Sequence, residues 1–122
     1  MPPSNPLAIA TSSLVRLVNE EASYHRELEQ QTSRLKKMEE EQNAGLPDED
    51  GNREFLLKQE RKAVEETKAV FPTLRKKISD GITKLESLLA EEAQKGSNSN
   101  VDQINAAKDA ISKAKTALRE SA

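Results

Sequence analysis

Apolar residues recur with a period of 3.5 along most of this chain, and that period constrains the fold more than any other feature. From Leu7 the apolar positions alternate in steps of three and four residues as far as Met38, interrupted by Glu21 and Gln31. This spacing places apolar side chains in a narrow stripe along one side of a helix. Charged residues make up 33 % of the 122 residues and aromatic residues 2 %. Because this composition is typical of long amphipathic helices, an all-α fold is predicted.

Two turn segments divide the periodic pattern into three predicted helices: residues 43–52, with two glycines and a proline, and residues 95–100, rich in Ser and Asn. Asn5 followed by Pro6 marks the first start, since asparagine caps first-turn amides and proline fits the first helical position. Asn100 is the expected cap of the third helix. Short turns between long helices favour antiparallel neighbours, so the prediction is an antiparallel three-helix bundle. In order, the expected parts are a disordered tail over residues 1–5 and a single domain over residues 6–120, with helices at about 6–43, 53–95 and 101–120.

Pro72 lies in the middle of the second predicted helix. Proline lacks an amide hydrogen and crowds the carbonyl four residues earlier, so it could divide this segment into two helices. The apolar stripe keeps its phase through Pro72, whereas a turn would normally reset it. The prediction is therefore one continuous helix, kinked at Pro72, with the stripe Val64, Thr67, Phe71, Leu74 and Ile78.

The third helix is about half as long as the other two, so it can cover only part of them. Folding at the two turns brings it beside the second helix from about Lys76 onward, and beside the first up to about Glu20. The same register places Tyr24 beside Phe71 and Pro72. The remaining two-helix arm has a thin apolar seam, consisting of Leu28, Leu35, Met38, Leu57 and Val64. This arm is interpreted either as a protein-binding surface or as a marginal hairpin with ordinary surface leucines.

Several function classes lack support in the sequence. The charge of −2 results from 19 basic and 21 acidic residues, without the clustered basic face that nucleic acid requires. There is no cysteine, His25 is the one histidine, and Asp48 to Gly51 reads as turn chemistry rather than as a calcium loop. No apolar run approaches the roughly 20 residues that span a membrane. The expectations are a cytoplasmic protein that is not an enzyme, with no cofactor, metal, nucleic acid or membrane partner.

The basic run Arg75-Lys76-Lys77 is interpreted as a solvated helix face paired with Glu20 and Glu21. Exposed pairs of this kind contribute only about 0.2 to 1 kcal/mol each to stability. The alternative is a basic patch that meets an acidic partner.

The residues also resemble the tubulin-binding cofactor A family over about Leu7 to Glu92. The first helix resembles that family at Arg16-Leu17-Val18, Glu20, Tyr24, Glu27, Gln30-Gln31 and Lys37-Met38. The stretch Thr67-Lys68-Ala69-Val70-Phe71-Pro72 resembles the family's mid-helix segment, and Leu85, Leu88 and Leu89 continue the resemblance. Thr73, Ala69 and Val70 depart from the family's usual residues, and the third helix matches only in pattern.

The resemblance implies a cytoplasmic, cytoskeleton-associated chaperone that captures β-tubulin after chaperonin release and passes it toward assembly of the α/β heterodimer. The alternative function is a structural or adaptor bundle that tethers another protein. Monomer and homodimer both remain possible. Tyr24 and Phe71 could equally be packed against each other in the bundle, which is the favoured interpretation for these two. The expected partner-binding residues are Arg16, Tyr24, Glu27, Gln31, Phe71 and Arg75.

Overall fold

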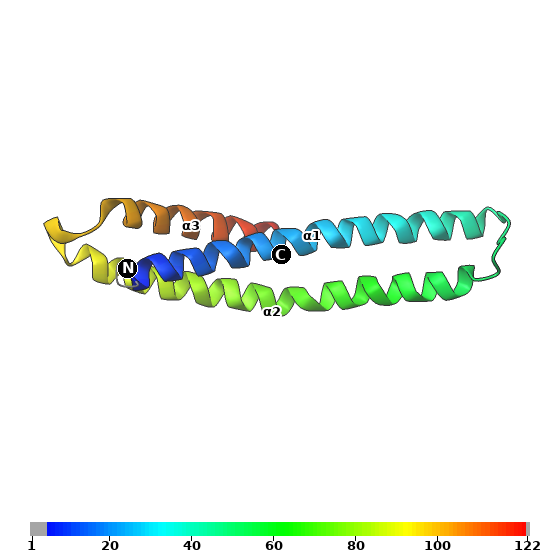
Figure 1. Cartoon of the computed structure of the whole chain (residues 1–122), viewed down its shortest axis with the longest axis horizontal. Coiled ribbons are helices and arrows are strands. Elements are labelled where there is room, and N and C mark those ends of the chain that lie inside the picture. Colours follow the sequence, from blue (N-terminus) through cyan, green and yellow to red (C-terminus); the bar gives the residue numbers. More distant parts are fainter. Residues whose placement is uncertain (1–4, 122) are drawn as a thin grey trace. The chain divides into compact units, whose positions relative to one another are not determined.

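The computed structural model describes residues 5–121, which form three α-helices and a short 3-10 helix without any strand (Figure 1). The predicted all-helical fold is confirmed, while the tail predicted over residues 1–5 lies outside the described residues except for Asn5. Helix α2 is continuous through Pro72, as the unbroken apolar phase predicted. The elements are α1 (Pro6–Asn43), α2 (Arg53–Ala93), the 3-10 helix η1 (Gly96–Asn98) and α3 (Val101–Glu120).

Helix α2 ends at Ala93, two residues earlier than predicted. The amides of Gln94 and Lys95 donate to the carbonyls of Glu91 and Glu92, so the chain tightens from α to 3-10 geometry there. Gly96 follows with φ of +61°, a conformation that a residue with a Cβ rarely adopts. The prediction overlooked that this tightening begins before the glycine.

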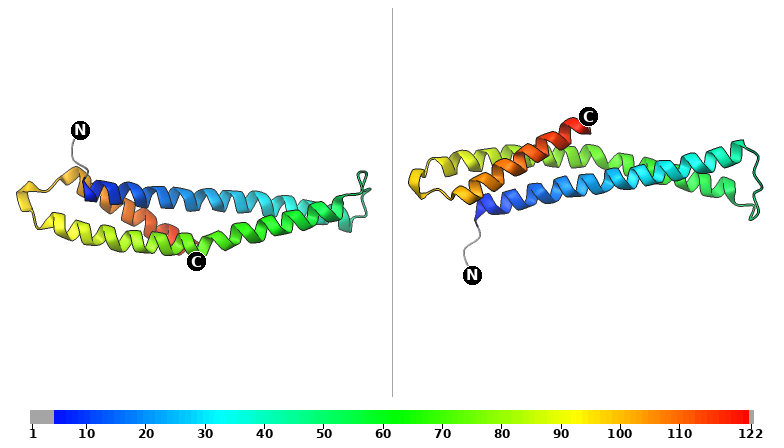
Figure 2. Two further views of the ribbon diagram at one scale, coloured as in Figure 1. Left: turned by 60° about the horizontal axis from the view of Figure 1, so that its bottom comes forward. Right: turned by 90° about the horizontal axis from the view of Figure 1, so that it is seen from above.

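The chain divides into two compact units, and both long helices contribute to each. Unit 1 contains the described residues up to Glu21 together with those from Thr73 onward, and unit 2 is Ala22–Pro72. Helix α3 therefore belongs with the first part of α1 and the last part of α2, as the predicted register required (Figures 1 and 2). The single domain expected over residues 6–120 stays a prediction.

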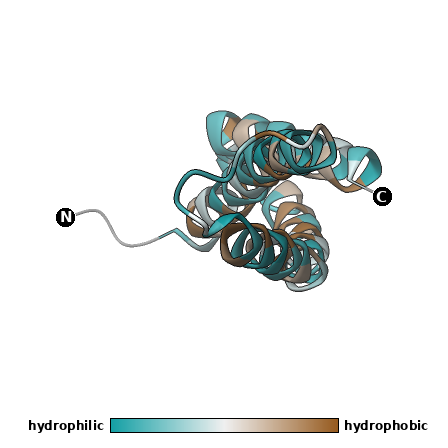
Figure 3. Cartoon of the chain, turned by 90° about the vertical axis from the view of Figure 1, so that its right-hand side faces the viewer, coloured by the Kyte–Doolittle hydropathy of each residue, from teal (hydrophilic) through white to brown (hydrophobic). Residues whose placement is uncertain are grey.

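Unit 1 is a three-helix bundle around an apolar core. Helices α1 and α3 run parallel, because Asn5 Nδ2 donates to Gln103 Oε1 (2.8 Å) and Ser121 Oγ donates to Glu21 Oε2 (3.2 Å). Alternation of hydrophobic and hydrophilic residues along the helices is visible in Figure 3. The buried core consists of Leu7, Ala10, Leu14, Ile78, Ile82, Leu85, Ala107, Ala110, Ile111 and Ala114.

Gly81 allows α1 and α2 to pack closely in unit 1. A Cβ built at this position would lie 3.1 Å from Leu14 Cδ1, which is tighter than an ordinary van der Waals contact. Leu14 is fully buried, so it has little room to move away. Glycine at residue 81 is thus explained by side-chain packing, despite its low helix propensity.

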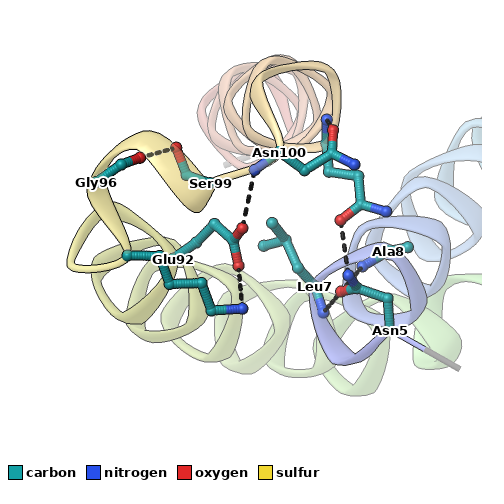
Figure 4. A network of polar contacts seen from close by, with 9 residues as sticks. Asn5, Leu7, Ala8, Glu92, Gly96, Ser99 and Asn100 are labelled. Carbon is teal, nitrogen blue, oxygen red and sulfur yellow. Dashed lines mark hydrogen bonds and ion pairs between the residues drawn. The ribbon is translucent and has the colours of Figure 1, made fainter. Parts of the chain in front are cut away.

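A polar network joins the helix ends of unit 1 (Figure 4). The Glu92 carboxylate accepts hydrogen bonds from the Asn100 amide (3.0 Å) and Lys95 Nζ (2.9 Å). Asn100 Oδ1 accepts from the Gln103 amide (3.1 Å), and Asn5 Oδ1 accepts from the Leu7 amide (2.8 Å). Both predicted asparagine caps are confirmed, because each side chain satisfies a first-turn amide.

Unit 2 is an antiparallel helical hairpin with few buried apolar side chains. Its register is fixed by Arg34–Glu60 (3.3 Å), Glu39–Arg61 (3.5 Å) and Gln42–Glu54 (3.2 Å), as predicted from folding at the first turn. The buried residues that the structure describes in this unit are Leu57, Val64, Thr67 and Gln31. Because two of these four side chains are polar, the predicted thin seam is confirmed.

The loop of unit 2 is organised by Asp48. The Asp48 carboxylate accepts a hydrogen bond from the Arg53 amide (3.2 Å to Oδ2), and the Asp48 carbonyl accepts one from the Gly51 amide (3.1 Å). Gly51 has φ of +69°. Asp48 therefore supports the start of α2, in keeping with the turn chemistry predicted for this segment.

Candidate partner-binding surface

Four of the six predicted partner-binding residues lie in unit 2. Tyr24 and Phe71 are half-buried, and Glu27 is exposed. Gln31, in contrast, is only 7 % exposed. A partner that docks on the intact hairpin can reach Glu27 and the exposed parts of the two rings, whereas buried Gln31 is shielded from it.

Phe71 packs against His25, a contact that the sequence reading did not single out. The ring centroids of His25 and Phe71 are 4.4 Å apart, with an interplanar angle of 30°. The predicted register places Tyr24 beside Phe71 and assigns no contact to His25. The register of the first turn also brings residues 25 and 71 level with each other, so this pair was accessible from the sequence.

Gln31 introduces polarity into the seam of unit 2. Its amide nitrogen donates a long hydrogen bond to Glu27 Oε1 (3.4 Å). Within the described part of the chain, Gln31 Oε1 is a buried side-chain atom without a hydrogen-bond partner. A buried acceptor without a donor costs roughly 1–3 kcal/mol of stability. Gln31 thus contacts the exposed Glu27 carboxylate by a long hydrogen bond. Its unpaired buried oxygen lowers the stability of the hairpin.

The other two predicted residues, Arg16 and Arg75, lie in unit 1. Arg16 is exposed and lines a shallow depression on α1 together with Ile9 and Ser12. Arg75 is half-buried, and its Nη1 donates to the Ser121 carbonyl (3.4 Å). The guanidinium of Arg75 is thereby held at the end of α3.

Ser121 connects Arg75 with Glu21, since the Ser121 hydroxyl donates to the buried Glu21 carboxylate. The proximity that the register predicted for Arg75 and Glu21 is therefore present in unit 1. Lys76 instead forms an ion pair with Asp80 on its own helix (3.5 Å). The basic run is partly structural and partly solvated.

Residues 5–121 contain no group of three or more His, Cys, Asp or Glu side chains placed to hold a metal ion. No helix among them is long and apolar enough to cross a membrane. The pKa of Glu92 is lowered below its usual value, first by the Asn100 amide hydrogen bond and then by Lys95, whereas desolvation opposes the shift. This carboxylate belongs to the network that joins the helix ends.

The family of the chain follows from its match to a known protein family. The model of the family described as tubulin binding cofactor A matches residues 2–111. The chain belongs to the tubulin binding cofactor A family. The match extends past Glu92, where the resemblance noticed in the sequence ended, and into α3. The third helix is therefore part of the family pattern as far as residue 111.

A solved structure supports the affiliation with tubulin binding cofactor A. The chain is similar to the crystal structure of tubulin folding cofactor A from Arabidopsis thaliana, with 25 % sequence identity and a TM-score of 0.68. The alignment covers 90 % of this chain and 92 % of that chain. No curated protein sequence matches the chain. Membership of a family of tubulin-folding cofactors assigns the chain to chaperone-type proteins and makes tubulin its expected class of partner.

Proposed function

We propose that this chain captures β-tubulin folding intermediates after chaperonin release and passes them toward assembly of the α/β heterodimer. It does so as a cytoplasmic, cytoskeleton-associated binding protein without catalytic activity. The observation that carries the proposal is the family match over residues 2–111. The contrast between the two units supplies the physical support.

Unit 2 presents apolar side chains that its own two helices bury incompletely. Leu28, Leu35 and Met38 are half-buried on α1, and Val70 and Phe71 are half-buried on α2. In unit 1, α3 packs against the corresponding pair of helices and closes the core. A partner that covers the open seam of unit 2 would remove its remaining apolar surface from water, which favours binding by about 25 cal/mol per Å². This surface suits a partly folded protein with an exposed apolar stripe.

The six predicted residues take different parts in this proposal. Glu27 and Arg16 are exposed and supply charge, while Tyr24 and Phe71 offer the edges of half-buried rings. Arg75 presents a cation whose position is held by Ser121. Gln31 is buried and contributes only through its hydrogen bond to Glu27.

A binding experiment with separated tubulin chains tests the function. The purified protein is added to β-tubulin newly released from chaperonin, and complex formation is followed by native gel electrophoresis. The expected result is a complex with β-tubulin and little or none with α-tubulin prepared in the same way. Absence of a β-tubulin complex, or equal binding of both chains, would favour the structural or adaptor bundle instead.

Charge reversal tests the place of Arg75 on the proposed surface. Arg75→Glu should weaken β-tubulin capture about tenfold, because an attractive cation becomes a repulsive anion on the docking surface. Arg75→Gln removes the charge but keeps a hydrogen-bond donor for Ser121, so it should weaken capture less. Lys84→Glu makes the same charge change at an exposed site on α2 and serves as the matched control. Circular dichroism confirms that helicity is retained, and unchanged capture by Arg75→Glu would remove Arg75 from the site.

A further inference from the structure

The loop end of unit 2 exposes large apolar side chains without any role in the seam. Leu46 is 49 % exposed, Phe55 59 % and Leu56 42 %. Phe55 and Leu56 lie in the first turn of α2, and Leu46 lies in the loop before it. Burying such side chains in a protein core is the usual outcome of folding, so three of them exposed at one end suggest a contact with another molecule.

A shallow depression forms at this end, and its lining combines apolar and acidic side chains. Met38, Pro47 and Leu56 contribute the apolar part of the lining. The acidic part comes from Glu41, Asp48, Glu49 and Asp50. We call this surface, together with Leu46 and Phe55, the acidic tip.

The acidic tip carries more negative charge than the net charge of the whole chain suggests. Residues 39–54 contain seven acidic residues and one basic residue, a net charge of −6. The rest of the chain contains the other 18 basic and 14 acidic residues, a net charge of +4. The one basic residue, Arg53, already donates from Nη2 to the Pro47 carbonyl (2.9 Å). Acidic charge this dense attracts cations over about 8–10 Å at physiological ionic strength.

A metal ion does not account for this arrangement. No group of three or more acidic side chains within the described residues is placed to hold one. The Asp48 carboxylate is engaged by the Arg53 amide, and the Glu39 and Glu54 carboxylates are engaged by Arg61 and Gln42. Glu49 and Asp50 are exposed and line the depression together with Pro47 and Leu56. Exposed apolar side chains beside acidic ones complement a protein segment that carries an apolar side chain between lysines or arginines.

We propose that the acidic tip is a second docking site, which binds a basic amphipathic segment of a partner protein. The apolar side chain of that segment packs against Met38 and Leu56, and its basic side chains meet Glu49 and Asp50. The acidic tip shares Met38 with the open seam proposed as the β-tubulin site, whereas its loop residues and Phe55 and Leu56 lie outside that seam. A partner bound at the tip leaves Tyr24 and Glu27 accessible, because these residues precede the tip by more than ten positions along α1.

Fluorescence anisotropy with a labelled peptide tests the acidic tip on the full chain. The probe is a helical peptide of about 18 residues made of leucine and lysine, and its counterpart replaces every lysine by glutamate. The lysine peptide should bind and the glutamate peptide should not. Two double variants remove the two properties of the tip, namely Phe55→Ser with Leu56→Ser, and Glu49→Lys with Asp50→Lys. Each should weaken binding of the lysine peptide at least about tenfold, which corresponds to about 1.4 kcal/mol.

Matched controls separate docking at the tip from general attraction of a cationic peptide. Ile9→Ser with Val101→Ser removes two exposed apolar side chains from unit 1, and Glu65→Lys with Glu66→Lys reverses two exposed charges elsewhere on α2. Both controls should change affinity less than about threefold. Equal losses in tip and control variants, or full binding by Phe55→Ser with Leu56→Ser, would overturn the proposal. The same tip variants should retain β-tubulin capture, so failure of either proposal is visible separately.

Discussion

Replacing Gln31 by leucine should stabilise the protein, although it alters a residue of the proposed partner-binding surface. Gln31 is 7 % exposed, and its Oε1 is the buried acceptor in unit 2 that lacks a donor among the described residues. The hydrogen bond from its amide nitrogen to Glu27 Oε1 is 3.4 Å long and therefore weak. Leucine has a similar volume and would continue the seam beside Leu57 and Val64.

The magnitude follows from three terms that the substitution changes. Removing an unsatisfied buried acceptor recovers roughly 1–3 kcal/mol, and loss of the weak bond to Glu27 subtracts about 0.5–1.5 kcal/mol. Added apolar burial contributes a further fraction of the roughly 1.5–3 kcal/mol of a whole leucine side chain. We expect Gln31→Leu to raise the free energy of unfolding by about 1–2 kcal/mol. With an unfolding entropy of about 2.1 cal/mol/K per residue, this corresponds to a rise in Tm of about 4–8 °C.

Gln30→Leu is the control, because the neighbouring Gln30 is exposed and its substitution should change stability by less than about 0.5 kcal/mol. Urea denaturation followed by circular dichroism gives the free energies, and hydrogen exchange of the unit 2 amides locates the effect. A Gln31→Leu variant that is no more stable than Gln30→Leu would refute the reasoning. It would mean that the Gln31 amide is satisfied in the native protein, by water or by movement of the hairpin.

Two further expectations concern unit 1. The pKa of Glu92 is lowered in the folded state, so its hydrogen bonds contribute fully to stability at pH values above the usual glutamate pKa of about 4.3. This contribution is lost as the pH falls through the lowered pKa of the folded state. Urea titrations should therefore show Glu92→Gln less stable than the parent at neutral pH, with the difference narrowing in acid; a constant difference would contradict this. Gly81→Ala should stabilise a Leu14→Ala background by about 1 kcal/mol through helix propensity, but the parent by less, because the new Cβ meets Leu14 Cδ1 at 3.1 Å. Additive free energies in this double-mutant cycle would show that residues 14 and 81 do not compete for space.

Much of the fold was predictable, because it follows from periodicity and from chain length. The apolar stripe predicted three helices, and the asparagines before Pro6 and Val101 marked two of their starts. The length of the third helix predicted how far it covers the other two helices. The structure places the boundary of unit 1 at Glu21 and Thr73. Local signals and simple geometry suffice for such features, since they need no knowledge of individual side-chain contacts.

The remaining features depend on neighbours that are distant in sequence. Gln31 interrupts the predicted seam, but its burial depends on how α2 packs against it. Glycine at residue 81 lowers the helix propensity of α2. The reason for glycine there is the close packing against Leu14, a residue of another helix. The link from Arg75 through Ser121 to Glu21 joins α2 to α1 through the residue that follows α3. A periodic pattern predicts on which face of a helix a residue lies, but not which residue of another helix it contacts.

The difference between the two units bears on how a binding protein can release what it holds. Ten buried apolar residues from three helices share the core of unit 1. The hairpin of unit 2 has already removed Leu57 and Val64 from water, so a partner gains only from the half-buried remainder of its seam. A partial gain limits affinity, because hydrophobic free energy scales with the area newly buried and association itself is costly. Under the proposed function this limit is useful, since a protein that passes on a folding intermediate must bind it and then let it go.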